Sequence, residues 1–177
     1  MIVPGHRIRW KKLQRECEGY LELGMPEHAL ATLARLGDPA GFGAHTLYLW
    51  GEALRTLERC EEAILPLARA AEAAPEDIHV RLALGWCYKR TGQLGLAIES
   101  LEAALGTEPD EALLHYNLAC YWSLAGNKRH TLAYLSRSLA IEPAYCELIE
   151  DEPDFDPFRS DPEFQALCHG AWSGDRL

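Results

Sequence analysis

Apolar residues along this chain recur at three- and four-residue steps and fall into pairs of segments. In the clearest pair they are Leu84, Tyr88, Ala97, Ile98, Leu101 and Leu105. This spacing places them on one face of each of two helices. Gly92 lies between the two segments and Pro109 follows the second, as expected for a turn and for a helix end. The pattern therefore predicts a helical hairpin.

The hairpin pattern repeats with a period of 34 residues. The period is marked by Leu33, Leu67, Leu101 and Leu135, by the turn positions Gly24, Glu58, Gly92 and Gly126, and by Pro75, Pro109 and Pro143. A period of this length is typical of stacked helical hairpins, in which each hairpin buries its apolar face against its neighbours. We expect four units, at residues 10–43, 44–77, 78–111 and 112–145, preceded by a basic segment at residues 1–9.

The third unit carries a recognisable motif. It reads Arg81-x-x-Leu84-Gly85-x-x-Tyr88, then Ala97-x-x-x-Leu101, then Pro109, which resembles the tetratricopeptide repeat. The second and fourth units follow the same pattern, whereas the first departs from it at Glu16, Cys17 and Gly41. The resemblance implies an all-α fold, a right-handed α-solenoid of about four hairpins with capping helices at its C-terminal end. Within the second unit, Pro66 is expected to bend its helix or to remove a hydrogen bond.

Residues 146–177 resemble the terminating segment that follows the last repeat in many bacterial tetratricopeptide proteins. A fifth unit begins at Cys146 and is stopped by Pro153, and Asp161 followed by Pro162 predicts the start of a last helix. Phe155 and Phe158 are expected to pack on the final hairpin. The acidic cluster in this segment lacks the EF-hand pattern and is interrupted by prolines, so we predict no metal site here. Its members are Glu150, Asp151, Glu152, Asp154 and Asp156.

Composition narrows the function further. The chain has 177 residues, 48% hydrophobic content and a net charge of −10, which argues against general nucleic-acid binding. The six cysteines are spread without C-x-x-C pairs and are expected to be reduced and packed. Charges interrupt each apolar run near the N-terminus, and no stretch approaches the roughly 20 apolar residues of a membrane span. We therefore expect a cytoplasmic protein without membrane association.

The resemblance places the binding surface on the concave side, at fixed positions of the first helix of each unit. Arg55 and Arg90 hold two of these positions. The candidate residues for a partner-binding groove are His45, Tyr48, Glu52, His79, Leu82, Trp86, Lys89, Tyr116 and Cys120. Trp86 is the expected hot spot, since aromatic anchors dominate binding energy at interfaces. The alternative is that these side chains pack against one another or are covered by the C-terminal segment.

Motifs of enzymes are absent. None of the seven histidines lies in H-E-x-x-H, and there is neither G-x-S-x-G nor a phosphate-binding loop. Cys87 and Cys120 have no histidine placed to activate them. The cations that clamp chaperone C-terminal carboxylates in some tetratricopeptide proteins are also missing. We predict neither catalysis nor a cofactor.

The sequence thus favours a non-catalytic protein-interaction module that binds a peptide or helix of a protein partner. Two alternatives remain open. One is a dedicated chaperone resembling those of type III secretion, and the other is a structural subunit that associates with itself. The segment from Arg7 to Arg15 is basic and the stretch from Glu147 to Glu163 is acidic, so weak head-to-tail association between copies is a further hypothesis.

Overall fold

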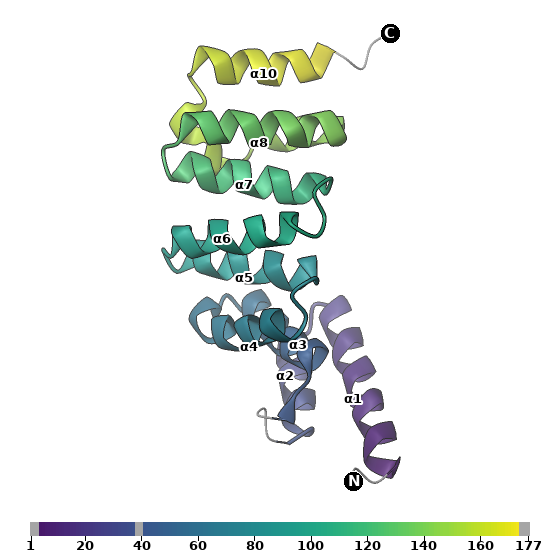
Figure 1. The fold of residues 1–177 in the computed structure, drawn as a ribbon. Helices are drawn as coiled ribbons and strands as arrows, with labels where there is room; N and C mark the ends of the chain where they lie inside the picture. Colours follow the sequence, from purple (N-terminus) through teal and green to yellow (C-terminus); the bar gives the residue numbers. More distant parts are fainter. Residues whose placement is uncertain (1–3, 38–40, 174–177) are drawn as a thin grey trace. The chain divides into compact units, whose positions relative to one another are not determined.

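The computed structural model describes residues 4–37 and 41–173, and the secondary structure in these ranges is entirely helical. In chain order, the helices before the C-terminal segment are α1 (Pro4–Glu22), α2 (Pro26–Ala34), α3 (Ala44–Thr56), α4 (Cys60–Ala73), α5 (Ile78–Arg90), α6 (Leu94–Leu105), α7 (Ala112–Leu124) and α8 (Lys128–Ile141). Helix α1 pairs with α2, α3 with α4, and α7 with α8 as hairpins (Figure 1). The all-α, repeat-like class predicted from the sequence is confirmed.

The C-terminal segment follows α8 as a series of short elements. These are the 3-10 helices η2 (Pro143–Tyr145) and η3 (Pro153–Phe158), with α9 (Cys146–Ile149) between them, and finally α10 (Pro162–Ser173). Where the sequence predicts an abortive fifth unit, the structure has the four-residue helix α9. Asp161 begins α10 as predicted, because its carboxylate accepts hydrogen bonds from the backbone N–H groups of Glu163 and Phe164.

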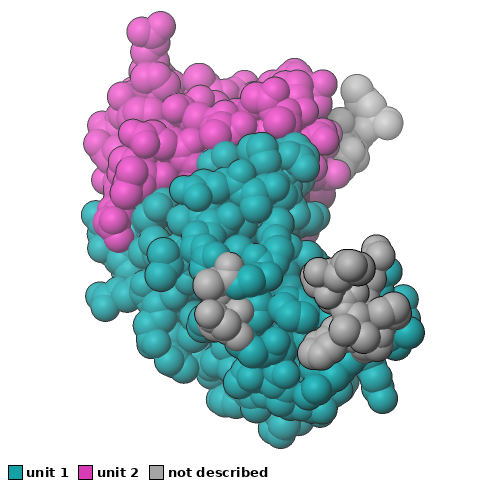
Figure 2. Space-filling view, turned by 60° about the horizontal axis from the view of Figure 1, so that its bottom comes forward, with its two compact units in different colours: residues 1–92 teal, residues 93–177 magenta. Residues whose placement is uncertain are grey.

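The chain forms two compact units, residues 1–92 and 93–177 (Figure 2). The boundary lies between α5 and α6. Unit 1 contains α1 to α5, and its core includes Leu47, Leu67 and Val80. Unit 2 contains α6 to α10, and its most deeply buried side chains include Tyr121, Leu118 and Leu135.

Helices α3, α5 and α7 begin at Ala44, Ile78 and Ala112, the residues at which the second, third and fourth units are predicted to start. The first helix is longer than expected. It begins at Pro4, so residues 4–9 of the predicted basic segment are its first turns, with proline at a position that suits a helix start. Residues 1–3 of that segment and the tail 174–177 lie outside the described residues.

Pro66 lies inside α4, which continues from Cys60 to Ala73 around it. The ring is buried in the core of unit 1. Proline has no backbone N–H, so one hydrogen bond of the helical ladder is absent at this point. The helix is not terminated, because tertiary packing of its apolar face supplies most of the stability of such a helix.

The four turn positions share one backbone conformation. Gly24, Glu58, Gly92 and Gly126 have φ values of 67°, 58°, 75° and 71°, in the left-handed region that glycine adopts without cost. Glu58 is the one residue among these four that is not glycine, and holding its backbone in this region costs roughly 1–2 kcal/mol of conformational free energy.

Replacing Glu58 with glycine should therefore raise the free energy of unfolding by about 0.5–1 kcal/mol, after the greater flexibility of glycine in the unfolded chain is subtracted. The ion pair with Arg90 that is lost is long, at 3.9 Å, and exposed, so it contributes little. Urea denaturation measures the change. Arg59→Gly is the control, because Arg59 has φ of −85° and should gain nothing; equal effects of the two variants would contradict the explanation.

Candidate functional site

The first helices of the hairpins in unit 1 pack side by side, with α3 in contact with both α1 and α5. The residues predicted to line the groove in this unit come from α3 and α5, and we call the surface that they share the α3–α5 face. It consists of His45, Tyr48, Glu52, Arg55, His79, Leu82, Trp86, Lys89 and Arg90. Of these, His45, His79 and Arg90 are exposed, and the others are half-buried.

Trp86 lies at the centre of the polar contacts on this face. The Arg55 guanidinium lies over its ring at 5.1 Å from the centroid, and that of Arg90 at 5.6 Å. Both distances are typical of cation–π contacts. Trp86 is thus held by a cation from α3 and by one from its own helix, which orders an indole that remains half-exposed.

Arg55 is itself fixed by Glu52, one turn earlier in α3. Its Nε and one terminal nitrogen donate to the two carboxylate oxygens at 2.8 Å and 2.5 Å. This bidentate pair raises the pKa of Arg55 through the hydrogen bonds to Glu52. Burial, and next the charge of Glu52, raise the pKa of Tyr48. Glu52 therefore orients the arginine that covers the tryptophan.

Helix α5 presents Trp86 from a well-capped start. The Asp77 carboxylate accepts hydrogen bonds from the N–H groups of His79 and Val80, so His79 lies in the first turn of α5 at the edge of the face. In the first turn of α3, the His45 ring contacts Glu18 of α1 at 2.5 Å. His45 and His79 thus both lie in the first turns of their helices, before Glu52 and Trp86 along the chain.

Two predicted site residues, Tyr116 and Cys120, lie in unit 2 and are buried, at 5% and 2% exposure. The Tyr116 ring meets the edges of Tyr145 and Phe155 at 5.5 Å and 5.7 Å between centroids. The prediction that these two side chains line an open groove is therefore wrong for this structure. The C-terminal segment covers α7, since Phe155 of η3 is fully buried with its ring against Tyr116.

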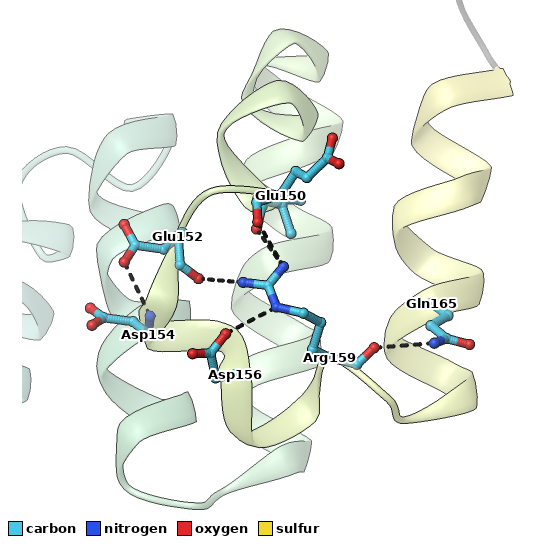
Figure 3. Close-up of polar contacts among 7 residues, drawn as sticks. Glu150, Glu152, Asp154, Asp156, Arg159 and Gln165 are labelled. Carbon is cyan, nitrogen blue, oxygen red and sulfur yellow. Dashed lines mark hydrogen bonds and ion pairs between the residues drawn. The ribbon is translucent and has the colours of Figure 1, made fainter.

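Sequence reasoning left three contributors out of the candidate site. Arg55 and Arg90 hold predicted concave positions, and their spacing from Glu52 and Trp86, three and four residues, is the signal that could have identified them. Arg159, which holds the covering segment, has no such signal. It donates hydrogen bonds to the backbone carbonyls of Ile149, Glu150 and Glu152, at 3.2 Å, 2.9 Å and 2.8 Å (Figure 3).

The cysteines agree with the prediction of reduced, packed thiols. All six are free, and Cys17, Cys60, Cys87 and Cys120 are buried. Burial raises the pKa of Cys87 to about 12, so its thiol stays protonated near neutral pH and is a poor nucleophile. In the described part of the chain, no helix combines the length and apolar character needed to span a bilayer.

Comparison with known proteins supports the repeat assignment. The tetratricopeptide repeat family model matches residues 78–111, the bounds predicted for the third unit. A search of curated proteins gives no match. Solved structures with a similar fold include a double mutant of MamA from RS-1, with 18% identity, a TM-score of 0.76, and coverage of 93% of this chain and 91% of that one.

Two further solved structures are similar. One is MamA, residues 41 to the end, from Desulfovibrio magneticus RS-1, with 19% identity, a TM-score of 0.68, and coverage of 94% of this chain and 97% of that one. The other is YrrB, described as a tetratricopeptide protein with an unusual peptide-binding site. It has 23% identity, a TM-score of 0.68, and coverage of 76% of this chain and 70% of that one. At these identities the likeness concerns the fold. Together with the matched repeat and the hairpin order, it shows a fold of tetratricopeptide-like hairpins, one of which, at residues 78–111, matches the tetratricopeptide repeat model.

Proposed function

We propose that this protein is a non-catalytic interaction module that binds a peptide or helix of a protein partner on the α3–α5 face, with Trp86 as the main anchor. The observation that carries the proposal is Trp86 itself, a large aromatic side chain that is only half-buried and has the guanidinium groups of two arginines over its ring. Tryptophan and arginine are the residue types most enriched at binding hot spots. The peptide-binding site named for YrrB adds support from a protein of the same fold.

The charges on this face favour a partner with an apolar or aromatic anchor rather than a strongly charged one. Glu52 is paired with Arg55, and Glu58 lies 3.9 Å from Arg90, so each of the two arginines over the indole has an acidic partner. A partner side chain that stacks on Trp86 would gain apolar contact without having to separate these pairs. The proposed site is therefore smaller than the groove predicted from the sequence and lies within unit 1.

The test begins with selection of peptides on the full-length protein from a random displayed library. A selected peptide is synthesised, and its affinity is measured by calorimetry for the wild type and for Trp86→Ala. Leu65→Ala is the matched control, because Leu65 is a large apolar residue of unit 1, on α4, with 68% of its surface exposed. Selected peptides that bind the two variants equally well would contradict the proposal.

Head-to-tail association stays a second proposal about partners, and it rests on charge. Arg9, Lys11, Lys12 and Arg15 are exposed on α1, and Glu147, Glu150, Asp151 and Asp156 are exposed in the C-terminal segment. Attraction between such ends is screened by salt. We expect sedimentation velocity at high protein concentration to show a larger average mass in low salt than in 0.5 M salt, a condition of about 4 Å screening length. The same monomeric mass in both buffers would exclude it.

A further inference from the structure

Three metal-ligating side chains meet in unit 2 between α7 and the C-terminal segment. The Cys120 Sγ and carboxylate oxygens of Glu152 and Asp154 all lie within 4.8 Å of one another. Cys120 and Asp154 are buried, and Glu152 is half-buried. Thiolate and carboxylate groups are established ligands of Zn²⁺, and here they come from parts of the chain about thirty residues apart.

An independent observation points into the same cluster. The hydroxyl of Tyr116 is buried, and none of the residues that the structure describes forms a hydrogen bond with it. Tyr116 precedes Cys120 by one helical turn, so the two side chains share a face of α7, and its ring meets Phe155, the neighbour of Asp154. Burial, and then the charges of Cys120, Glu152 and Asp154, raise its pKa. A buried hydroxyl without a partner needs an explanation, and a cation or its bound water in the cluster would provide the missing contact.

The loop that supplies the carboxylates is held in place by its own contacts. Arg159 fixes the backbone from Ile149 to Glu152, and the Glu152 carboxylate accepts a hydrogen bond from the Asp154 N–H at 3.1 Å. Figure 3 shows the two carboxylates on the same side of the loop, away from the Arg159 guanidinium. Contacts of this kind orient metal ligands and maintain their geometry.

We propose that Cys120, Glu152 and Asp154 form a site for a divalent cation of the zinc class, with the Tyr116 hydroxyl contacting the ion or its bound water. The thiolate favours Zn²⁺ over Mg²⁺ and Ca²⁺, which take oxygen ligands. On binding, the Cys120 thiol releases its proton to solvent and an S–Zn bond forms. The ion offsets the repulsion between two neighbouring carboxylates and joins α7 to the C-terminal segment. The sequence pattern alone misses this site, because Cys120 is distant from the acidic run.

The test uses Co²⁺ as a spectroscopic substitute for Zn²⁺. Full-length protein treated with a chelator is titrated with Co²⁺, and thiolate-to-cobalt absorption in the near ultraviolet is recorded before competition with Zn²⁺. We expect one equivalent to bind, displacement by Zn²⁺, and loss of the absorption band in Cys120→Ser. Asp154→Asn and Glu152→Gln should each weaken binding by at least about 10-fold, and circular dichroism checks that each variant is folded.

Two controls separate this site from adventitious binding. Cys146→Ser removes a half-exposed thiol of the C-terminal segment, and Glu150→Gln removes an acid whose side chain is exposed beside the cluster. Both should bind Co²⁺ like the wild type. The proposal is overturned if the wild type shows no thiolate band with Co²⁺, or if the band persists in Cys120→Ser. Peptide binding at Trp86 is an independent readout and should not depend on the cation.

Discussion

Phe155→Ala should lower the free energy of unfolding of unit 2 by about 3–5 kcal/mol, the cost of removing a large aromatic side chain from a core. Phe155 is fully buried, and its ring contacts Tyr116 at 5.7 Å and Phe164 at 5.4 Å between centroids. It therefore connects η3 both to α7 and to α10. Without the Phe155 ring, the C-terminal segment is held only by its polar contacts and by its remaining apolar residues, which bury less surface.

Hydrogen exchange shows which part of the chain is destabilised by Phe155→Ala, and by how much. Amides of η3 and α10 should lose protection in Phe155→Ala, whereas those of α3 in unit 1 should keep it, because local openings differ in free energy along a structure. Phe158→Ala is the matched control, since Phe158 lies in the same 3-10 helix and is only half-buried. If the two variants lose stability equally, Phe155 is not the residue that holds the segment.

Gly51→Ala should be strongly destabilising, by about 1–3 kcal/mol or more. A Cβ atom added at Gly51 would lie 2.4 Å from Leu67 Cγ and 2.6 Å from Leu67 Cδ2. Leu67 is fully buried in the core of unit 1, so it has little room to move. The missing side chain at this position is what allows α3 and α4 to approach.

The control reverses the sign of the expected effect. Gly19 lies inside α1, and a Cβ atom added there would meet no atom within 4 Å, so Gly19→Ala should stabilise the protein by about 0.5–1 kcal/mol through helix propensity. Thermal or urea denaturation of both variants gives the comparison. A neutral or stabilising effect of Gly51→Ala would show that the α3–α4 contact is not close-packed.

The sequence predicts the repeats well, because the 34-residue period constrains several positions of each hairpin at once. Helix starts at Ala44, Ile78 and Ala112 follow from it, and the turn conformation holds even where Glu58 replaces glycine. The start of α1 at Pro4 is missed, because the first unit departs from the repeat pattern at Glu16 and Cys17. The repeat period therefore predicts the helices inside the array better than it predicts the residue at which the first helix begins.

The repeat period also explains why the sequence predicts only part of the candidate site. Periodicity tells which face of a first helix points away from the repeat core, and it places Tyr48, Glu52 and Trp86 on that face. It cannot tell what covers that face. Tyr116 and Cys120 hold the same register positions in α7, yet η3 lies over them, because Phe155 and Arg159 belong to a segment without repeat character.

Under the proposed function, a partner binds on the α3–α5 face through Trp86, while the equivalent surface of α7 is covered by the C-terminal segment of the same chain. Calorimetric titration of a selected peptide into wild type, Trp86→Ala and Leu65→Ala tests this most directly. We predict that Trp86→Ala weakens binding by about 30-fold or more, a hot-spot loss of about 2 kcal/mol, and that Leu65→Ala leaves the dissociation constant unchanged. Equal affinities for wild type and Trp86→Ala would contradict the account.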